Sequence, residues 1–501
     1  MRDVGATDST FRPALLLMSG RTLAFAATFF IPVVMARVFD PTDFGTYKQL
    51  LLVYSTLYGA AQLGMAESLF YFLPGSGERA GRYVANSFLF LAAAGAVCGA
   101  LLDAASGGIS RWLHNGSLSG HLPLIAAFLG LMLSSAGLEI VMIARRHYLW
   151  ASVSYGASDV TRAACFVAAA LLWRQLDAVL AGAVAFALLR LAAALGYVWS
   201  FRRTARFDGR LLVEQLGYAG PFELAVLLEI IQANFHQYAV SYSFDAATFA
   251  VYAVGCLQIP FVDTVANSTW NVMMVRMAEA RRDGRPDRVL EIWHDTTRKL
   301  ALVFFPLIAM LLVGARELVV LLFTEQYQAS VPVFIVSTTI IGLSVLATDS
   351  VLRVYAQTRV LLVLNAVRLV LVVVLIAPFI ALLQLPGAML VMVLATAAAK
   401  GLALVRMSRL MGVGLDRLLP WRSLGATAAA ATIAALAGMT AKSFLGGTPL
   451  SSLTAAIVTG AGAYAALLLG LGLLGENERA ALAGWRRRLV ARGQSPARSR
   501  G

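Results

Sequence analysis

Apolar runs long enough to cross a bilayer recur along the whole chain. A transmembrane helix needs ~20 consecutive apolar residues to span ~30 Å of hydrocarbon, and we find fourteen such runs between residues 13 and 474. Hydrophobic residues make up 59% of the 501 residues and charged residues 14%, against ~45–50% and ~25% in soluble domains. The sequence therefore predicts an all-α polytopic membrane protein. It excludes a soluble enzyme, a disordered chain and a secreted disulfide scaffold. The predicted spans are 13–36, 49–73, 83–105, 121–144, 148–173, 177–200, 215–240, 249–275, 300–315, 329–352, 360–383, 386–405, 424–441 and 451–474.

The basic residues indicate how these spans are oriented. The net charge is +14, but the arginines mostly lie in short gaps between apolar runs, which favours membrane orientation over nucleic-acid binding. Fourteen spans place both termini on one side. With that side taken as cytoplasmic, 30 Lys and Arg lie there, 6 lie opposite and 5 lie inside spans. Cytoplasmic loops carry the excess of positive charge, so we expect a multi-pass protein of the bacterial inner membrane with both ends in the cytoplasm.

Two weak motifs separated by nearly the same distance predict an internal repeat. The pattern F-D-x-x-x-F-x-x-Y occurs at Phe39–Tyr47 and again at Phe244–Tyr252, 205 residues later. Asp159–Arg162 likewise corresponds to Asn365–Arg368, with an offset of 206. Because six spans is an even number, the two repeats run in the same direction and predict two bundles related by an axis along the membrane normal.

This repeat predicts the organisation of the chain. We expect an N-lobe of six helices, a basic interlobe linker, a C-lobe of helices 7–12, two additional helices and a basic cytoplasmic tail. Arg202, Arg206 and Arg210 make the linker either an interfacial helix or a basic loop that fixes orientation. The predicted boundaries are 1–200, 201–214, 215–410, 411–475 and 476–501, in that order.

Five cations inside the predicted spans are the candidate binding residues. A charge at the bilayer centre costs roughly 2.5–3.5 kcal/mol on insertion scales, so each needs water, a ligand or a counter-ion. The simplest arrangement is an aqueous central cavity between the two bundles that attracts an anion such as a pyrophosphate, which Arg contacts in a bidentate manner. Intramembrane ion pairing is the alternative, and Asp159 is placed to neutralise Arg162. The five cations are Arg21, Arg162, Arg190, Arg368 and Lys400.

Carboxylates within the spans are either partners of these cations or sites for a coupling ion. Glu223 and Asp263 are the first candidates for ion coupling. The dipeptide Gly-Lys does not occur, so the sequence contains no Walker A loop. The five histidines show no metal-binding spacing, and no loop is large enough for a catalytic domain. We expect neither an enzyme nor a protein that uses a metal or other cofactor.

The N-terminal third resembles the start of the polysaccharide (O-antigen-type) repeat-unit flippases, members of the multidrug/oligosaccharidyl-lipid/polysaccharide exporter superfamily. The similarity rests on Gly20-Arg21, on Ala36–Tyr47, on Leu63–Ser68 and on Tyr71–Pro74. The segment Phe305–Tyr327 also resembles their ninth-helix region. Specific residues match in about a third of the chain, whereas the layout of spans matches throughout.

The resemblance implies two six-helix lobes around a central cavity and alternating access. It implies transfer of an undecaprenyl-pyrophosphate-linked oligosaccharide from the cytoplasmic to the periplasmic leaflet. The partners would be that lipid-linked glycan, membrane lipids and other polysaccharide-assembly proteins, with no nucleic acid. Two functions of the same superfamily stay open: a cation-coupled multidrug antiporter and a lipid II flippase. A cation carrier favours acidic cavity residues, which the five intramembrane cations argue against. A membrane polymerase or ligase needs a large catalytic loop that this chain lacks.

Overall fold

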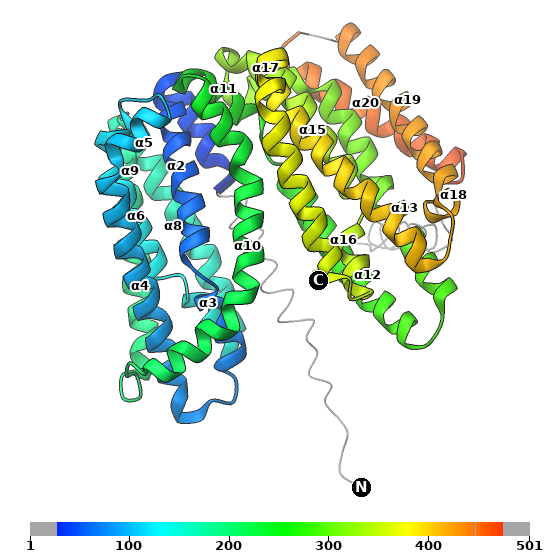
Figure 1. The fold of residues 1–501 in the computed structure, drawn as a ribbon. Helices are drawn as coiled ribbons and strands as arrows, with labels where there is room; N and C mark the ends of the chain where they lie inside the picture. Colours follow the sequence, from blue (N-terminus) through cyan, green and yellow to red (C-terminus); the bar gives the residue numbers. More distant parts are fainter. Residues whose placement is uncertain (1–27, 446, 474–501) are drawn as a thin grey trace, which may run out of the picture. The chain divides into compact units, whose positions relative to one another are not determined.

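The computed structural model describes residues 28–445 and 447–473, and within these ranges the regular structure is helical without β-strands (Figure 1). The predicted fold class, an all-α polytopic membrane protein, is therefore confirmed. The described chain forms two compact units. Unit 1 contains 28–260, 322–337 and 362–399, and unit 2 contains 261–321, 338–361 and 400–473 apart from residue 446.

Unit 1 is a bundle in which α4 packs against α6, α6 against α9 and α8 against α9, as Figure 1 shows. Most of its helices come from the first half of the chain. They are Thr28–Val38, α2 Pro41–Ala61, α3 Met65–Phe72, η1 Gly77–Arg79, α4 Ala80–Ala104, α5 Ser106–Trp112, α6 Leu118–Ser134, α7 Leu138–Ala144, α8 Tyr148–Trp173, α9 Leu176–Val198, η2 Trp199–Phe201, α10 Gly209–Ser243 and α11 Ala246–Gly255.

In unit 2, α19 packs against α20 and against α13. The Nε1–H of buried Trp293 on α13 donates 2.8 Å to the carbonyl of Leu418, which joins α13 to α18. The helices of the second half of the chain, some of them shared with unit 1, are α12 Pro260–Arg282, α13 Pro286–Val313, α14 Ala315–Phe323, η3 Glu325–Ser330, α15 Val331–Ser344, α16 Thr348–Val354, α17 Thr358–Met411, α18 Leu415–Leu418, α19 Trp421–Leu445 and α20 Pro449–Gly470.

The predicted spans coincide with helices wherever the structure describes them. Each predicted span from 49–73 onward overlaps between one and three consecutive helices, whereas 13–36 is described only from Thr28. In the described part of the chain, eight helices have the length and composition to cross a membrane. One of these, α17, covers both predicted spans 360–383 and 386–405. Its backbone leaves the helical region at Gln384 (φ 55°, ψ −136°), two residues before Pro386, which cannot donate a helical hydrogen bond.

The repeated motif forms the same helix start twice. Asp40 caps α2 by accepting a hydrogen bond from the Asp43 N–H, and Asp245 caps α11 by accepting from the Thr248 N–H. Aspartate is a preferred N-cap residue because its carboxylate satisfies an amide at the helix start. The Phe and Tyr that follow each cap are buried in both copies: Phe44, Tyr47, Phe249 and Tyr252.

The two copies also contact each other, because α2 and α11 pack tightly within unit 1. Gly45 lies so close to Ala246 that a Cβ built on Gly45 would be 1.8 Å from the Ala246 carbonyl oxygen. Glycine is required here because the approaching group is backbone, which cannot rotate away. The second Phe-Asp motif thus packs against the first.

The predicted linker 201–214 divides into two parts. Residues 202–208 are non-helical and α10 begins at Gly209, capped by Asp208. The pKa of Asp208 is lowered because its carboxylate accepts from the backbone N–H of Leu211, and from that of Arg210. Asp208 also pairs with Arg82 at 3.3 Å. The linker therefore lies against the start of α4. The predicted lobe boundaries stay a prediction, and the predicted tail 476–501 lies outside the described residues.

Candidate anion site

A cavity of about 290 Å³ opens in unit 1 beside α2, α10 and α11. Its wall combines aromatic and aliphatic side chains with one ammonium and two amide groups. This composition suits a ligand that carries both an anionic and a hydroxyl-rich part, because the ammonium attracts charge and the amides donate and accept hydrogen bonds. The lining residues are Thr28, Phe29, Pro32, Lys48, Gln237, Ala253, Val254, Cys256, Leu257, Gln258 and Phe323.

Lys48 provides the positive charge of this cavity. Sequence reasoning missed it, because it treated residues 37–48 as a gap between spans. The structure places Lys48 in α2, one turn after Phe44, with its Nζ 5.6 Å from the centre of the Phe44 ring. Lys48 forms no ion pair with any residue of the described chain. The signal that could have found it is Asp40-Pro41, an N-cap followed by proline at N1, which starts a helix at residue 41.

Arg162 and Arg190, both predicted site residues, lie in unit 1 and are paired with acids. Arg162 bonds to Asp159 one turn earlier on α8, with their side chains 31% and 25% exposed. Arg190 on α9 makes a bidentate contact with Glu139 on α7 at 2.9 and 2.7 Å. Its Nη1 also donates to Ser158 at 2.6 Å. The pairing that the sequence offered as an alternative for Arg162 is therefore present, and Arg190 is paired as well.

These two ion pairs stand beside a row of tyrosines on α2. Arg162 acts electrostatically on Tyr47, Tyr54 and Tyr58, and Arg190 acts on Tyr54 and Tyr58. Tyr54 and Tyr58 stack with their rings 5.6 Å apart. Both paired arginines therefore lie near the tyrosines of α2 in unit 1. Tyr47 precedes Lys48 on α2, so α2 contributes residues both to the surroundings of the ion pairs and to the cavity.

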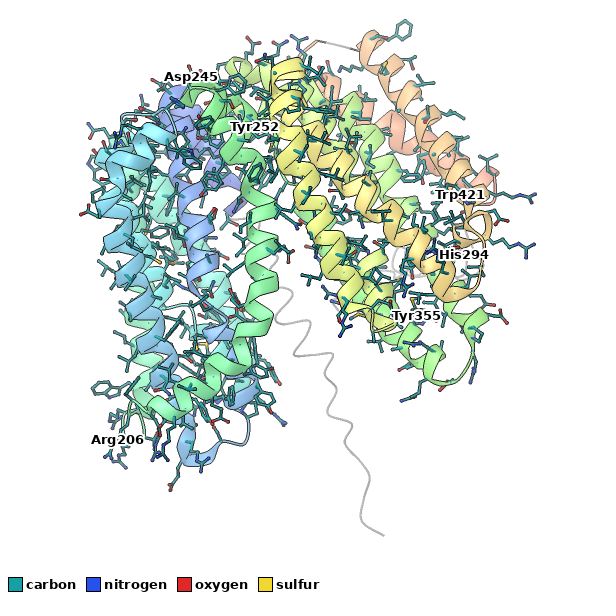
Figure 2. All side chains as sticks on the ribbon, in the orientation of Figure 1. Arg206, Asp245, Tyr252, His294, Tyr355 and Trp421 are labelled. Carbon is teal, nitrogen blue, oxygen red and sulfur yellow. The ribbon has the colours of Figure 1, made fainter. Side chains whose placement is uncertain are left out.

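Arg368 lies on the first half of α17, also in unit 1. One turn earlier, the Asn365 carbonyl accepts a 2.7 Å hydrogen bond from Gln232 on α10, which joins α17 to α10. Arg368 acts electrostatically on His236, whose Nδ1 is 2.6 Å from the Tyr252 hydroxyl. Figure 2 labels Tyr252 and Asp245 on α11 and the turn before it. Arg368 therefore lies near α10, the helix that contributes Gln237 to the cavity, but it is not itself a lining residue.

The two remaining predicted cations, Lys400 and Arg21, are not found in the described part of unit 1. Lys400 belongs to unit 2, where its ammonium donates to the Leu346 carbonyl. Arg21 lies outside the described residues. The structure therefore brings Arg162, Arg190 and Arg368 into one unit, together with Lys48.

The two acids predicted as candidates for ion coupling, Glu223 and Asp263, belong to different units. Glu223 on α10 is 4% exposed and acts electrostatically on Glu67 of α3, within unit 1. Asp263 is an exposed residue in the first turn of α12, within unit 2. Glu223 is thus buried near the exposed residue Glu67, whereas Asp263 is itself exposed.

Comparison with solved structures defines the class to which this arrangement of helices belongs. The chain is similar to the lipid II flippase MurJ in an inward closed conformation, with a TM-score of 0.66 and 11% identity over 92% of this chain and 99% of that one. It is also similar to an inward-facing multidrug resistance MATE family transporter of the MOP superfamily, with a TM-score of 0.60 and 12% identity over 80% and 98%. A MOP superfamily transporter from Pyrococcus furiosus, described by the reversed polarity of its binding pocket, gives a TM-score of 0.52 and 12% identity over 80% and 95%.

The fold is accordingly that of MOP superfamily transporters. In sequence, residues 34–332 match the family described as polysaccharide biosynthesis protein, and the chain belongs to that family. No curated protein matches the chain in sequence. The resemblance to polysaccharide flippases of this superfamily, predicted from the sequence, is therefore confirmed.

Proposed function

We propose that the protein flips an undecaprenyl-pyrophosphate-linked oligosaccharide repeat unit from the cytoplasmic to the periplasmic leaflet of the bacterial inner membrane by alternating access. Membership of the polysaccharide biosynthesis family supports a role in glycan assembly. The fold supports transport across a membrane. The observation that carries the choice of an anionic, sugar-bearing substrate is the cavity with Lys48 and two glutamines.

Charge accounting favours this substrate over a cationic one. Lys48 is partly buried, and an ammonium in such a place without a carboxylate partner is costly in a low-dielectric environment, so a bound phosphate oxygen would compensate it. Lys48 would set the positive potential of the cavity, because the charge of Arg162 is compensated by Asp159. A drug cation would be repelled by the same field, which argues against the multidrug antiporter.

The surface charge of unit 1 supports the proposed orientation. Two arginines predicted to be cytoplasmic contact the same segment, 200–208: Arg82 pairs with Asp208, and Arg145 donates to Ser200. Figure 2 labels Arg206 at this end of unit 1 and Asp245 at the opposite end. We therefore place the Arg206 end in the cytoplasm, with both termini on that side. Reporter fusions after residues 206 and 245 would test this, because a cytoplasmic fluorescent reporter should be active only at the first position.

Surface polysaccharide in a strain deleted for the gene tests the function. Arg162→Ala and Arg368→Ala should each lower surface polysaccharide while the protein is still produced at normal levels. Replacement by Lys should be partly tolerated, because Lys keeps the charge but loses the planar fork. Full glycan assembly in both Ala variants would contradict the role of these cations.

The second candidate function is that of a lipid II flippase. Of the three solved structures compared above, the lipid II flippase MurJ has the highest TM-score to this chain. The two functions differ in what depletion does to the cell. Loss of a lipid II flippase halts peptidoglycan synthesis, whereas loss of a repeat-unit flippase removes a surface polysaccharide. Growth of the deletion strain with normal peptidoglycan and no polysaccharide supports the first proposal.

A further inference from the structure

A second cavity lies away from Lys48, where α7, α8 and α9 meet in unit 1. It has a volume of about 410 Å³, within the range of small-molecule sites. It opens at a strongly apolar face, because Trp150, Val153 and Leu189 are 64%, 52% and 58% exposed. An exposed apolar face of this kind in a membrane protein contacts lipid chains. The residues lining this α7–α9 cavity are Leu138, Met142, Trp150, Val153, Ser154, Ala157, Ser158, Thr161, Phe186, Leu189, Arg190, Ala193 and Tyr197.

The polar groups that reach this cavity are largely bonded to one another. Arg190 is held by Glu139 and Ser158, and the Ser154 hydroxyl donates to Glu139 at 2.9 Å. Most remaining lining side chains are aliphatic or aromatic. Because the charge of Arg190 is compensated, the cavity is suited to an aliphatic chain rather than to an ionic group.

The mouth of the α7–α9 cavity is basic. Its lining residue Tyr197 contacts His147 through a 2.7 Å hydrogen bond. The Arg145 guanidinium lies 5.9 Å from the Tyr197 ring centre and 4.9 Å from that of Phe201. Arg145, Arg146 and His147 are all exposed. The aromatic rings hold Arg145 next to the cavity while its charge stays accessible.

This positive charge is not compensated within the described chain. Arg145, Arg146 and Arg202 form no ion pair with any described residue. Arg202 instead lies 5.6 Å from the ring of exposed Trp199. Trp and Tyr are typical of the membrane–water interface, where an anionic headgroup would meet such arginines.

We propose that the α7–α9 cavity is a binding site for an anionic glycerophospholipid of the membrane. One acyl chain occupies the cavity, and the phosphate contacts Arg145 and Arg146. An apolar cavity beside uncompensated exposed guanidinium groups matches an amphiphile with an aliphatic tail and a negative headgroup. A cavity of 410 Å³ suits one acyl chain better than an eleven-isoprene tail. This site is separate from Lys48 and does not depend on the transported substrate.

Native mass spectrometry of the purified full-length protein tests the headgroup contact, with phosphatidylglycerol and phosphatidylcholine of identical chains as probes. Wild-type protein should retain phosphatidylglycerol at least tenfold more tightly. The double variant Arg145→Ala/Arg146→Asn should lose most of that preference, about tenfold or more, because each basic residue near an anionic headgroup contributes several-fold. Asn is chosen because Arg146 has φ +62°, which Asn tolerates.

A matched control removes the same charge from the other end of the bundle. Arg111→Ala/Arg174→Asn changes two exposed arginines, and Arg174 terminates α8 with φ +51°. This variant should bind phosphatidylglycerol as the wild type does. Equal losses in both double variants, or equal binding of the two lipids by the wild type, would overturn the proposal.

The acyl-chain contact has its own pair of variants. Ala157→Phe fills the cavity that Ala157 lines, whereas Ala164→Phe places the same ring on exposed α8 surface two turns further along. The first should weaken phosphatidylglycerol binding at least fivefold and the second should not. Unchanged binding by Ala157→Phe would refute the site. So would displacement of phosphatidylglycerol by equimolar undecaprenyl pyrophosphate, which would identify the substrate as the occupant.

Discussion

Replacing Gly45 with alanine directly tests the contact between the two copies of the repeated motif. The added Cβ would lie 1.8 Å from the Ala246 oxygen and 2.5 Å from its carbonyl carbon. Both atoms are backbone, so no side-chain rotation relieves the overlap. To reach even 3.0 Å, α2 and α11 must move apart by at least 1.2 Å. Overpacking of this kind typically costs about 1–3 kcal/mol.

That cost should appear as local opening of α11. A loss of about 1–3 kcal/mol raises the population of the opened state about 5-fold to 150-fold. Amide hydrogen exchange at 248–255, measured by mass spectrometry in detergent or nanodiscs, should accelerate by a similar factor. Exchange in α4, which the contact does not involve, should stay unchanged.

Gly217→Ala provides the control for this experiment. Gly217 lies on exposed α10 surface, and a Cβ there meets nothing within 4 Å. Alanine also favours a helix over glycine by about 1 kcal/mol. The control should therefore exchange as the wild type does or more slowly. If Gly45→Ala behaves like Gly217→Ala, α2 and α11 are not in backbone contact, and the packing described for unit 1 is wrong.

Three further predictions concern buried charge, helix capping and the candidate anion site. Glu139→Gln should lower the free energy of unfolding by about 3–5 kcal/mol, since it leaves the largely buried Arg190 without its partner. The double variant Glu139→Leu/Arg190→Met should recover most of this loss, as measured by melting in detergent. Asp245→Ala should cost about 1 kcal/mol near pH 7. The pKa of Asp245 is lowered because its carboxylate accepts from Thr248. Its contribution is therefore fully present above the ordinary carboxyl pKa and is lost as pH falls through the lowered pKa, so the melting difference between variant and wild type should shrink as the solution is acidified below the ordinary carboxyl pKa. Lys48→Met should abolish saturable binding of undecaprenyl pyrophosphate without lowering the melting temperature, whereas Lys48→Arg should retain it; unchanged binding by Lys48→Met would exclude the cavity.

The positions of the helices were predictable because lipid imposes a simple rule on sequence. Each span must be apolar over its full length and must bond its own backbone, so spans such as 148–173 correspond closely to single helices. Breaks within a predicted span were harder to predict. The span 121–144 becomes α6 and α7, because three residues between them leave the helix without a proline or a charge to mark it.

The site was only partly predictable. A sequence indicates which charged residues lie within a membrane span, but it does not show which residues surround them in the fold. Arg190 was identified as an intramembrane cation, yet its partner Glu139 is 51 residues away on another helix. Lys48 was overlooked because it follows an N-cap rather than an apolar run. Its lack of a carboxylate partner is a property of packing, which only the structure displays.

The central claim is that a positively charged cavity in this carrier accepts a pyrophosphate-linked glycan and moves it between leaflets. The direct measurement is flipping of a fluorescently labelled undecaprenyl-pyrophosphate oligosaccharide in proteoliposomes, read by chemical quenching of the outer leaflet. Wild-type protein and Lys48→Arg should expose the inner-leaflet pool, whereas Lys48→Met should leave it protected as in empty liposomes. Wild-type protein that leaves this lipid protected, or Lys48→Met that flips it at the wild-type rate, would contradict the account.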